Sequence, residues 1–300
     1  MSDKVGVIGL GSMGLGVAQS LMRAGFDVAG HDVSPDRQEQ FVAAGGRTSS
    51  SPAHAATGAR AVIIMVENAA QTDTVLFGEA GAAVAMQPES VIISCATMAP
   101  DDAQRFEQRA AELDIHYLDA PVSGGSNKAR NGQLTAMSSG SAEAYAVARP
   151  VLESFTTRIY ELGETAGPGS AFKMVNQLLA GVHMAAACEA ITFAARLGLD
   201  LDRVYEVIKA SAGNSWMFEE RVPRILAGDY TPRSPVDNFA KELGVVTALG
   251  QREKMPLVLA TSALQMFVGA AAAGMGPNDA AAVALLLAKI AGVDLQGRDA

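Results

Sequence analysis

Short apolar runs alternate with helical segments along the first half of the chain. Because the runs carry few polar positions, they predict strands that are buried on both faces. These runs are Val5–Ile8, Phe26–His31, Ala61–Val66, Ser90–Ser94 and His116–Asp119. The helical segments between them run from Gly14 to Ala24, Gln38 to Ala44, Ser51-Pro52 onward, and Pro100 to Leu113. Strands that alternate with helices predict right-handed βαβ units in a parallel sheet, the α/β class of fold.

The pattern changes after this alternation. Two further strands are predicted at Gln133–Ser138 and Thr157–Leu162, on either side of a helix that starts at Ser141. The segment Gly163–Gly169 is the predicted end of this domain. Gly167–Gly198 is then almost wholly apolar and predicts a long buried helix over Ala171–Leu197, with Ser170 as its N-cap. The remaining predicted elements are all helices, at Arg203–Ala210, Phe218–Leu226, Asp237–Gln251, Leu257–Ala273 and Asn278–Ala291.

Composition narrows the class of protein. A chain of 300 residues with 49% hydrophobic content has room for two domains, and its net charge of −9 argues against a nucleic-acid partner. Cys95 and Cys188 lie in apolar runs and are expected to be buried thiols, and the four scattered histidines give no metal-binding spacing. The N-terminus does not have the pattern of a signal peptide. Charged residues interrupt or flank the apolar stretch Leu178–Ala195, so we expect a cytoplasmic protein with no membrane partner.

A glycine-rich motif follows the first predicted strand, reading Gly9-Leu10-Gly11-Ser12-Met13-Gly14. Its position between strand and helix is the context in which such a motif binds a dinucleotide. The first glycine allows a tight turn, the second lets a pyrophosphate approach the backbone, and the third lets the helix pack on the strand. The phosphates would accept hydrogen bonds from the first N–H groups of the helix.

Asp32 ends the second predicted strand, where a carboxylate accepts hydrogen bonds from the adenosine ribose and repels a 2′-phosphate. The sequence therefore predicts NAD rather than NADP as cofactor. Arg37 is close enough in sequence to weaken this preference, although its place after the helix start at Ser34-Pro35 favours an orientation toward solvent. Without the glycines, Asp32 would read as an ordinary turn or N-cap residue.

Two further segments carry polar groups that suit a small acid. The first segment follows a predicted strand and forms a bend, Asp119-Ala120-Pro121-Val122-Ser123-Gly124-Gly125. The N–H groups of this bend and the serine hydroxyl can hold a carboxylate, although Ser-Gly-Gly alone is usually a plain turn. Lys173, Asn176 and Gln177 lie three and four residues apart, which places them on one face of the long helix. A lone lysine at a helix end is most often solvated, and the alternative is a catalytic ammonium in a cleft.

Three stretches in order resemble the signatures of the β-hydroxyacid dehydrogenases, a family that includes 3-hydroxyisobutyrate dehydrogenase and tartronate semialdehyde reductase. They are Gly9–Gly14, Asp119–Gly125 and Gly169–Gln177. The resemblance covers essentially the whole chain. It implies an NAD-binding Rossmann domain over residues 1–165 and an all-helical domain over residues 166–300, which the long interdomain helix begins. Assembly into a homodimer or homotetramer is expected.

The resemblance also implies roles for individual residues. Lys173 matches the catalytic lysine, and Ser123, Gly124 and Gly125 match contacts to the substrate carboxylate. The cofactor positions outside the glycine motif are Val66, Thr97 and Lys241. Many members have asparagine four residues after the lysine, whereas this chain has Gln177 there and Asn176 one residue earlier, so either amide is a candidate for the substrate contact.

These residues suit hydride transfer between a small hydroxy acid and nicotinamide, with Lys173 as general base in oxidation and general acid in reduction. Within the family, the chain resembles the L-threonate dehydrogenases most, in the segments Lys173–His183, Asn214–Phe218 and Leu226–Asp237. That implies oxidation of a four-carbon sugar acid. Oxidation of 3-hydroxyisobutyrate and reduction of tartronate semialdehyde (2-hydroxy-3-oxopropionate) are the enzymatic alternatives, with a non-catalytic cofactor-binding scaffold as the alternative of another class.

Overall fold

The computed structural model describes residues 3–295 and divides the chain into two compact units, Met1–Lys173 and Met174–Ala300. The division falls within the long helix α8, Pro168–Arg196, so this helix begins in the first unit and continues in the second. The two units are described separately below.

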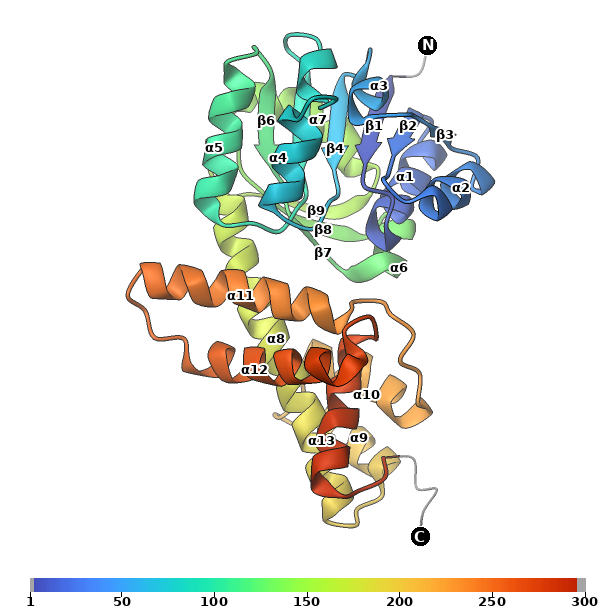
Figure 1. Cartoon of the computed structure of the whole chain (residues 1–300), viewed down its shortest axis with the longest axis vertical. Helices are drawn as coiled ribbons and strands as arrows, with labels where there is room; N and C mark the ends of the chain where they lie inside the picture. Colours follow the sequence, from blue (N-terminus) through green and yellow to red (C-terminus); the bar gives the residue numbers. More distant parts are fainter. Residues whose placement is uncertain (1–2, 296–300) are drawn as a thin grey trace. The chain divides into compact units, whose positions relative to one another are not determined.

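A six-stranded parallel sheet forms the centre of the first unit, in the order β3-β2-β1-β4-β5-β6 (Figure 1). Its strands are β1 (Lys4–Ile8), β2 (Asp27–His31), β3 (Arg47–Thr48), β4 (Ala61–Ile64), β5 (Val91–Ser94) and β6 (His116–Asp119). The order reverses direction at β1, so the loops after β1 and β4 lie at a topological switch point, where α/β sheets bind ligands. The predicted strands and the parallel α/β class are confirmed, and β3 is an addition that its short length conceals in the sequence.

Helices cover both faces of this sheet, which explains why its strands are apolar on both sides. One face packs with α1 (Ser12–Arg23) and α7 (Ala142–Glu153), and the other packs with α3 (Pro52–Ala56), α4 (Ala69–Phe77) and α5 (Pro100–Ala111). Two of these helices begin where predicted, and their N-caps Ser51 and Ser141 accept hydrogen bonds from the backbone N–H groups of His54 and Ala144. The remaining helix of this region, α2 (Pro35–Ala43), confirms the predicted helix start at Ser34-Pro35, and Pro35 occupies its first position, ahead of the helical pattern predicted from Gln38.

A second, three-stranded sheet packs against the same core and carries the turn after β6. Its order is β7-β8-β9, formed by β7 (Val122–Ser123), β8 (Leu134–Ser138) and β9 (Thr156–Glu161). The strands β8 and β9 confirm the two predicted strands of this region, whereas β7 and the short helix α6 (Gly125–Arg130) replace the expected simple bend.

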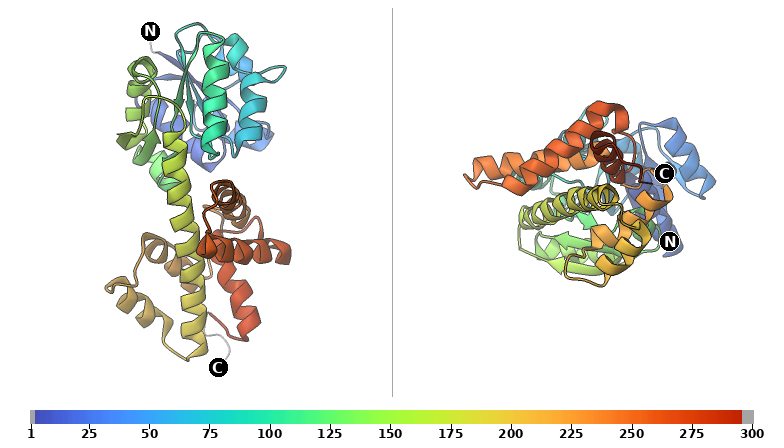
Figure 2. Two further views of the ribbon diagram at one scale, coloured as in Figure 1. Left: turned by 90° about the vertical axis from the view of Figure 1, so that its left-hand side faces the viewer. Right: turned by 90° about the horizontal axis from the view of Figure 1, so that it is seen from below.

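The second unit is entirely helical over its described residues. Figure 2 shows α8 with α9 (Leu201–Lys209) and α10 (Trp216–Ala227) on one side and α11 (Val236–Arg252), α12 (Val258–Ala270) and α13 (Val283–Ala291) on the other. These helices share one apolar core, to which α8 contributes Met184, Cys188 and Ile191. A Rossmann sheet in the first unit and an all-helical second unit confirm the predicted fold class.

Helix ends from α8 onward differ from the prediction at three places. The long helix starts at Pro168, so the prediction of Ser170 as its N-cap is wrong. The predicted helix Leu257–Ala273 ends its α-helical part at Ala270 and continues as a wider π turn, Ala271–Met275, in which Gly274 has a φ of 86°. The predicted helix Asn278–Ala291 becomes a short 3₁₀ segment, Ala280–Ala282, followed by α13.

Two described helices, α8 and the segment Val258–Met275, are long and apolar enough to span a membrane by length and composition alone. The core helices of water-soluble proteins meet the same criterion. In α8 the apolar residues Met184, Cys188 and Ile191 are buried against the other helices of the unit. The prediction that the whole helix is buried is wrong in part, because other apolar side chains on it are 48 to 62% exposed, namely Phe172, Val175, Leu179 and Phe193.

Candidate functional site

The glycine motif forms the turn from β1 into α1 and fits a dinucleotide. A Cβ atom added at Gly14 would lie 1.8 Å from the carbonyl oxygen of Gly9, so only glycine lets the helix start this close to the strand. At Gly11 an added Cβ would meet only the guanidinium of Arg37, at 3.8 Å, which leaves the backbone open to a ligand. Gly11 is also the N-cap of α1 and gives no side-chain cap, so the first N–H groups of the helix suit a phosphate.

Asp32 follows β2, and the residue is 5% exposed. One carboxylate oxygen accepts a hydrogen bond from the Leu10 N–H at 2.7 Å, and the other accepts from the Ser34 N–H at 2.9 Å. These bonds fix the carboxylate beside the glycine motif, as a ribose contact requires. Arg37 lies 3.5 Å from Asp32 with 49% of its side chain exposed, so the expectation that it points away into solvent is wrong in part.

Val66 and Thr97 follow the carboxyl ends of the adjacent strands β4 and β5, on the edge of the sheet where the glycine motif also lies. Thr97 is buried and Val66 is half-buried. Lys241 belongs to the second unit, on the first turns of α11. Its role toward the cofactor therefore stays a prediction.

The turn after β6 has the backbone shape that a carboxylate contact needs. Ser123 ends β7, Gly124 is the N-cap of α6 with a φ of 138°, and Gly125 has a φ of 79°. Both φ values lie where residues with a side chain are strained, which gives a physical reason for two glycines in succession. The stem of Lys128 covers Gly124, because its Cδ and Cβ atoms lie 3.0 and 3.2 Å from where a Cβ of Gly124 would be.

Lys173 is 7% exposed, and its ammonium nitrogen donates a hydrogen bond to the carbonyl oxygen of Val122 at 2.9 Å. Val122 immediately precedes Ser123, so the third sequence motif touches the second within the first unit. The alternative of a solvated lysine is thereby excluded. A buried amine beside a turn that can bind a carboxylate is the arrangement expected of a catalytic lysine.

Asp119 holds the start of α8 in place, a role that the sequence analysis missed. Its Oδ2 atom accepts hydrogen bonds from the N–H groups of Gly167 and Ser170 at 3.0 and 2.8 Å, and its Oδ1 accepts from the Ser170 hydroxyl at 2.7 Å. Burial raises the pKa of the Asp119 carboxyl, while the bonds from Ser170, Gly167 and Ser139 act in the opposite direction. A carboxylate at the N-terminus of a helix also interacts favourably with the helix dipole.

Asn176 and Gln177 form a hydrogen-bonded chain with Glu242 of α11, all within the second unit. The side-chain NH₂ of Asn176 donates to the side-chain oxygen of Gln177 at 2.8 Å. The NH₂ of Gln177 in turn donates to a carboxylate oxygen of Glu242. No local pattern in the sequence indicates Glu242, because its partner lies on another helix.

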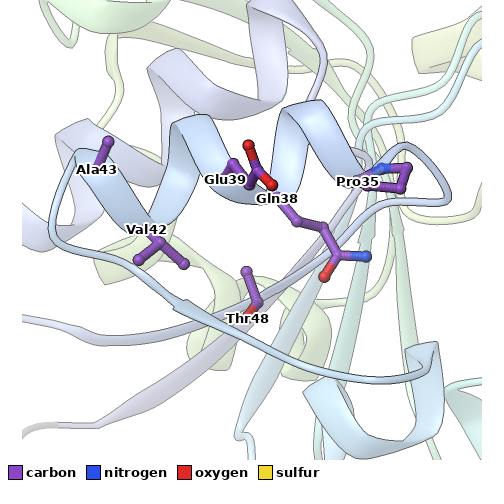
Figure 3. A pocket seen from close by; sticks show the side chains of 6 residues that line it. All are labelled: Pro35, Gln38, Glu39, Val42, Ala43 and Thr48. Carbon is purple, nitrogen blue, oxygen red and sulfur yellow. The ribbon is translucent and has the colours of Figure 1, made fainter.

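Other features lie apart from these residues. A hollow of about 480 Å³ between α2 and β3 is lined by Pro35, Gln38, Glu39, Val42, Ala43 and Thr48 (Figure 3) and contains none of the predicted site residues. Trp216, the first residue of α10, is 48% exposed and is therefore not anchored in the core. Cys95 and Cys188 are buried as predicted, and burial raises the pKa of each thiol to about 12.

Within residues 3–295, no three His, Cys, Asp or Glu side chains gather as a metal site would require.

Family models match both halves of the chain. Residues 4–163 match the NAD-binding domain of 6-phosphogluconate dehydrogenase, and residues 167–296 match the NAD-binding domain of NADP-dependent 3-hydroxyisobutyrate dehydrogenase. The boundary between the two matches falls at the start of α8.

Individual relatives are similar over nearly their whole length. L-threonate dehydrogenase of Cupriavidus necator is 50% identical over 99% of each chain, and that of Escherichia coli is 45% identical over 93% of each. Among solved structures, 3-hydroxyisobutyrate dehydrogenase from Salmonella typhimurium gives a TM-score of 0.89 at 44% identity, over 95% of this chain and 100% of that one. The Mycobacterium tuberculosis 3-hydroxyisobutyrate dehydrogenase with L-serine gives 0.83 at 28% identity, over 96% and 99%.

Proposed function

The chain belongs to the 3-hydroxyisobutyrate dehydrogenase-like family of NAD(P)-dependent hydroxyacid dehydrogenases, and from this premise we propose that it oxidises L-threonate or a closely related sugar acid. The proposal is supported by the identity of 50% to the Cupriavidus necator L-threonate dehydrogenase, across 298 residues. The match extends through both units, so it includes the helix that carries Lys173, Asn176 and Gln177. The second candidate is 3-hydroxyisobutyrate, because a relative of that name is 44% identical.

The chemistry of the site residues is consistent with a hydroxy acid. The N–H groups of Gly124 and Gly125, together with the hydroxyl of Ser123, are donors that suit a carboxylate. The amides of Asn176 and Gln177 suit hydroxyl groups, which both donate and accept hydrogen bonds. A sugar acid offers one carboxylate and several hydroxyls, whereas 3-hydroxyisobutyrate offers a single hydroxyl.

Lys173 has the central part in the proposed mechanism. Bound dinucleotide supplies the nicotinamide that accepts hydride from the substrate carbon. Lys173 takes the proton from the hydroxyl during oxidation and returns it during reduction, as a general base and then a general acid. Ser123, Gly124 and Gly125 hold the carboxylate, which fixes the orientation of the reacting carbon and lowers the entropic part of the barrier.

The observation that carries the proposal is the contact between Lys173 and Val122, because it joins the amine to the carboxylate-binding turn. The test is to incubate the purified protein with NAD and a panel of hydroxy acids while NADH absorbance is recorded. L-threonate is expected to give the highest kcat/KM, above 3-hydroxyisobutyrate and other short hydroxy acids. Highest turnover of 3-hydroxyisobutyrate would replace the first candidate with the second, and binding of NAD without turnover of any acid would favour a scaffold.

We propose NAD as the preferred cofactor because Asp32 lies where it would meet the ribose 2′-hydroxyl and repel a 2′-phosphate. Asp32→Asn keeps the shape and an acceptor for the Leu10 N–H but removes the charge. This variant is expected to raise kcat/KM for NADP relative to NAD by about 10- to 100-fold, the effect of removing one like charge near a phosphate. Initial rates with each cofactor measure the ratio.

Arg37→Gln is the matched control, because Arg37 forms an ion pair with Asp32. If Asp32 determines the preference, the Arg37 variant should leave NAD as the favoured cofactor. A wild-type preference for NADP that disappears in Arg37→Gln would instead assign the cation to a 2′-phosphate and contradict the proposal.

Three further aspects of the protein remain proposals. The functional domains are residues 1–165 and 166–300, and the compact units divide a little later, inside α8. The enzyme assembles as a homodimer or homotetramer, which sedimentation at micromolar concentration would show. It works as a cytoplasmic protein with a small-molecule substrate and with neither nucleic acid nor membrane as partner.

A further inference from the structure

We propose that Glu242 is a positioning residue that orients the amide of Asn176, through Gln177, so that Asn176 presents its oxygen to a hydroxyl of the substrate. The inference rests on the proposed function for the identity of the substrate. It adds a residue outside the recognised motifs and decides between the two amides that the sequence left open.

The direction of the hydrogen-bonded chain follows from the chemistry of its end. An ionised carboxylate has no hydrogen to donate, so the side chain of Gln177 must turn its NH₂ toward Glu242. The oxygen of Gln177 then faces Asn176 and accepts from the Asn176 NH₂ at 2.8 Å. Asn176 is left with its oxygen directed away from Gln177. The carboxylate thus fixes the orientation of two amides, each of which has nearly the same shape when reversed.

Close packing of two helices brings Glu242 within reach of Gln177. Leu243, the next residue on α11, is fully buried against Gly181 of α8. A Cβ added at Gly181 would lie 2.8 to 2.9 Å from three atoms of the Leu243 side chain, so the helices approach each other because this residue is glycine. Gln177 lies one turn before Gly181 on α8 and is buried, which shields its side of the bond to the half-buried Glu242 from water.

The Asn176 end of this hydrogen-bonded chain suits a hydroxyl rather than a carboxylate. The oxygen of Asn176 is an acceptor, which attracts an O–H group and repels a carboxylate oxygen. Asn176 lies one turn after Lys173, so the two residues share the face of α8 that carries the catalytic lysine of the proposal. A second hydroxyl on the substrate, such as a sugar acid has, would be recognised by this acceptor.

The first experiment compares L-threonate with 3-hydroxyisobutyrate, which lacks a second hydroxyl. Glu242→Gln keeps the length of the side chain, but its amide can offer either a donor or an acceptor, so the orientation of Gln177 is no longer imposed. We expect the ratio of kcat/KM for L-threonate to that for 3-hydroxyisobutyrate to fall about 10-fold, through KM for L-threonate, because one well-aligned hydrogen bond is weakened. KM for NAD and the melting temperature should not change.

A double exchange separates orientation from simple loss of charge. In Gln177→Glu combined with Glu242→Gln, the carboxylate at position 177 can only accept, so Asn176 must again turn its NH₂ toward it. The double variant is therefore expected to recover the ratio to within about threefold of the wild type, whereas Glu242→Gln alone does not. Glu253→Gln, which removes one charge from an exposed residue at the end of the same helix, should have no effect.

A second readout needs no substrate. In protein labelled with ¹⁵N at asparagine, the side-chain NH₂ signal of Asn176, identified by its absence in Asn176→Asp, should shift in Glu242→Gln and return in the double variant. An unchanged Asn176 signal in Glu242→Gln would overturn the inference, whichever acid the enzyme oxidises. A shifted signal with no turnover of L-threonate would uphold the orienting chain and reject only the proposed substrate.

Discussion

Lys173→Met is expected to lower kcat for hydroxy acid oxidation by about 1,000-fold or more, within the range for loss of a general acid and base. Methionine keeps most of the length and apolar volume of the buried stem but has no amine to accept the substrate proton. The glycine motif and Asp32 are unchanged, so the dissociation constant for NAD should stay within about twofold. Single-turnover formation of NADH measures the chemical step, and fluorescence titration measures cofactor binding.

Two controls make this result specific to proton transfer. Lys173→Arg keeps a positive charge, but a guanidinium does not lose its proton near neutral pH, so this variant should be almost as slow as Lys173→Met. Lys209→Met removes a lysine from the exposed end of α9 and should be as active as the wild type. Turnover by Lys173→Met within about tenfold of the wild type would contradict the assigned role.

The sequence predicted those parts of the fold that depend on local pattern. Buried strands such as Ala61–Ile64 and Val91–Ser94 stand out because all of their residues except Ser94 are apolar, and Gly9–Gly14 stands out because glycine spacing reflects backbone geometry. The helix α4 was missed because no clear apolar periodicity marks it. Its start depends on Asn68, whose side chain accepts from the Gln71 N–H.

The candidate site was predictable only where one segment supplies the chemistry. Lys173 and Ser123 were found through motifs, but their proximity through Val122 depends on the packing of β7 beside α8. Glu242 and Asp119 act through partners that lie 65 and 51 residues away in sequence, at Gln177 and Ser170. Such pairs leave no periodic or local signal, so they emerge only when the fold is known.

Asp119→Ala is expected to destabilise the first unit by about 3 to 5 kcal/mol, because it leaves the buried N–H groups of Gly167 and Ser170 without an acceptor, at about 1 to 3 kcal/mol each, and adds a small cavity. Since Lys173 follows Ser170 by less than one turn, a loosened helix start should also displace the amine from Val122. We therefore expect kcat to fall about 10-fold or more in the fraction that remains folded. Urea unfolding and steady-state kinetics measure the two effects.

Asp119→Asn tests whether the acceptor or the charge matters. The amide oxygen can still accept from both N–H groups. The Ser170 hydroxyl, which donates to the carboxylate in the wild type, can rotate so that its oxygen accepts from the new NH₂. If the hydrogen bonds hold α8 in place, this variant should lose less than half of the stability that Asp119→Ala loses and should keep most of its activity. Equal losses in the two variants would mean that the carboxylate acts through its charge on the helix dipole, and no loss in either would remove Asp119 from the account of how Lys173 is positioned.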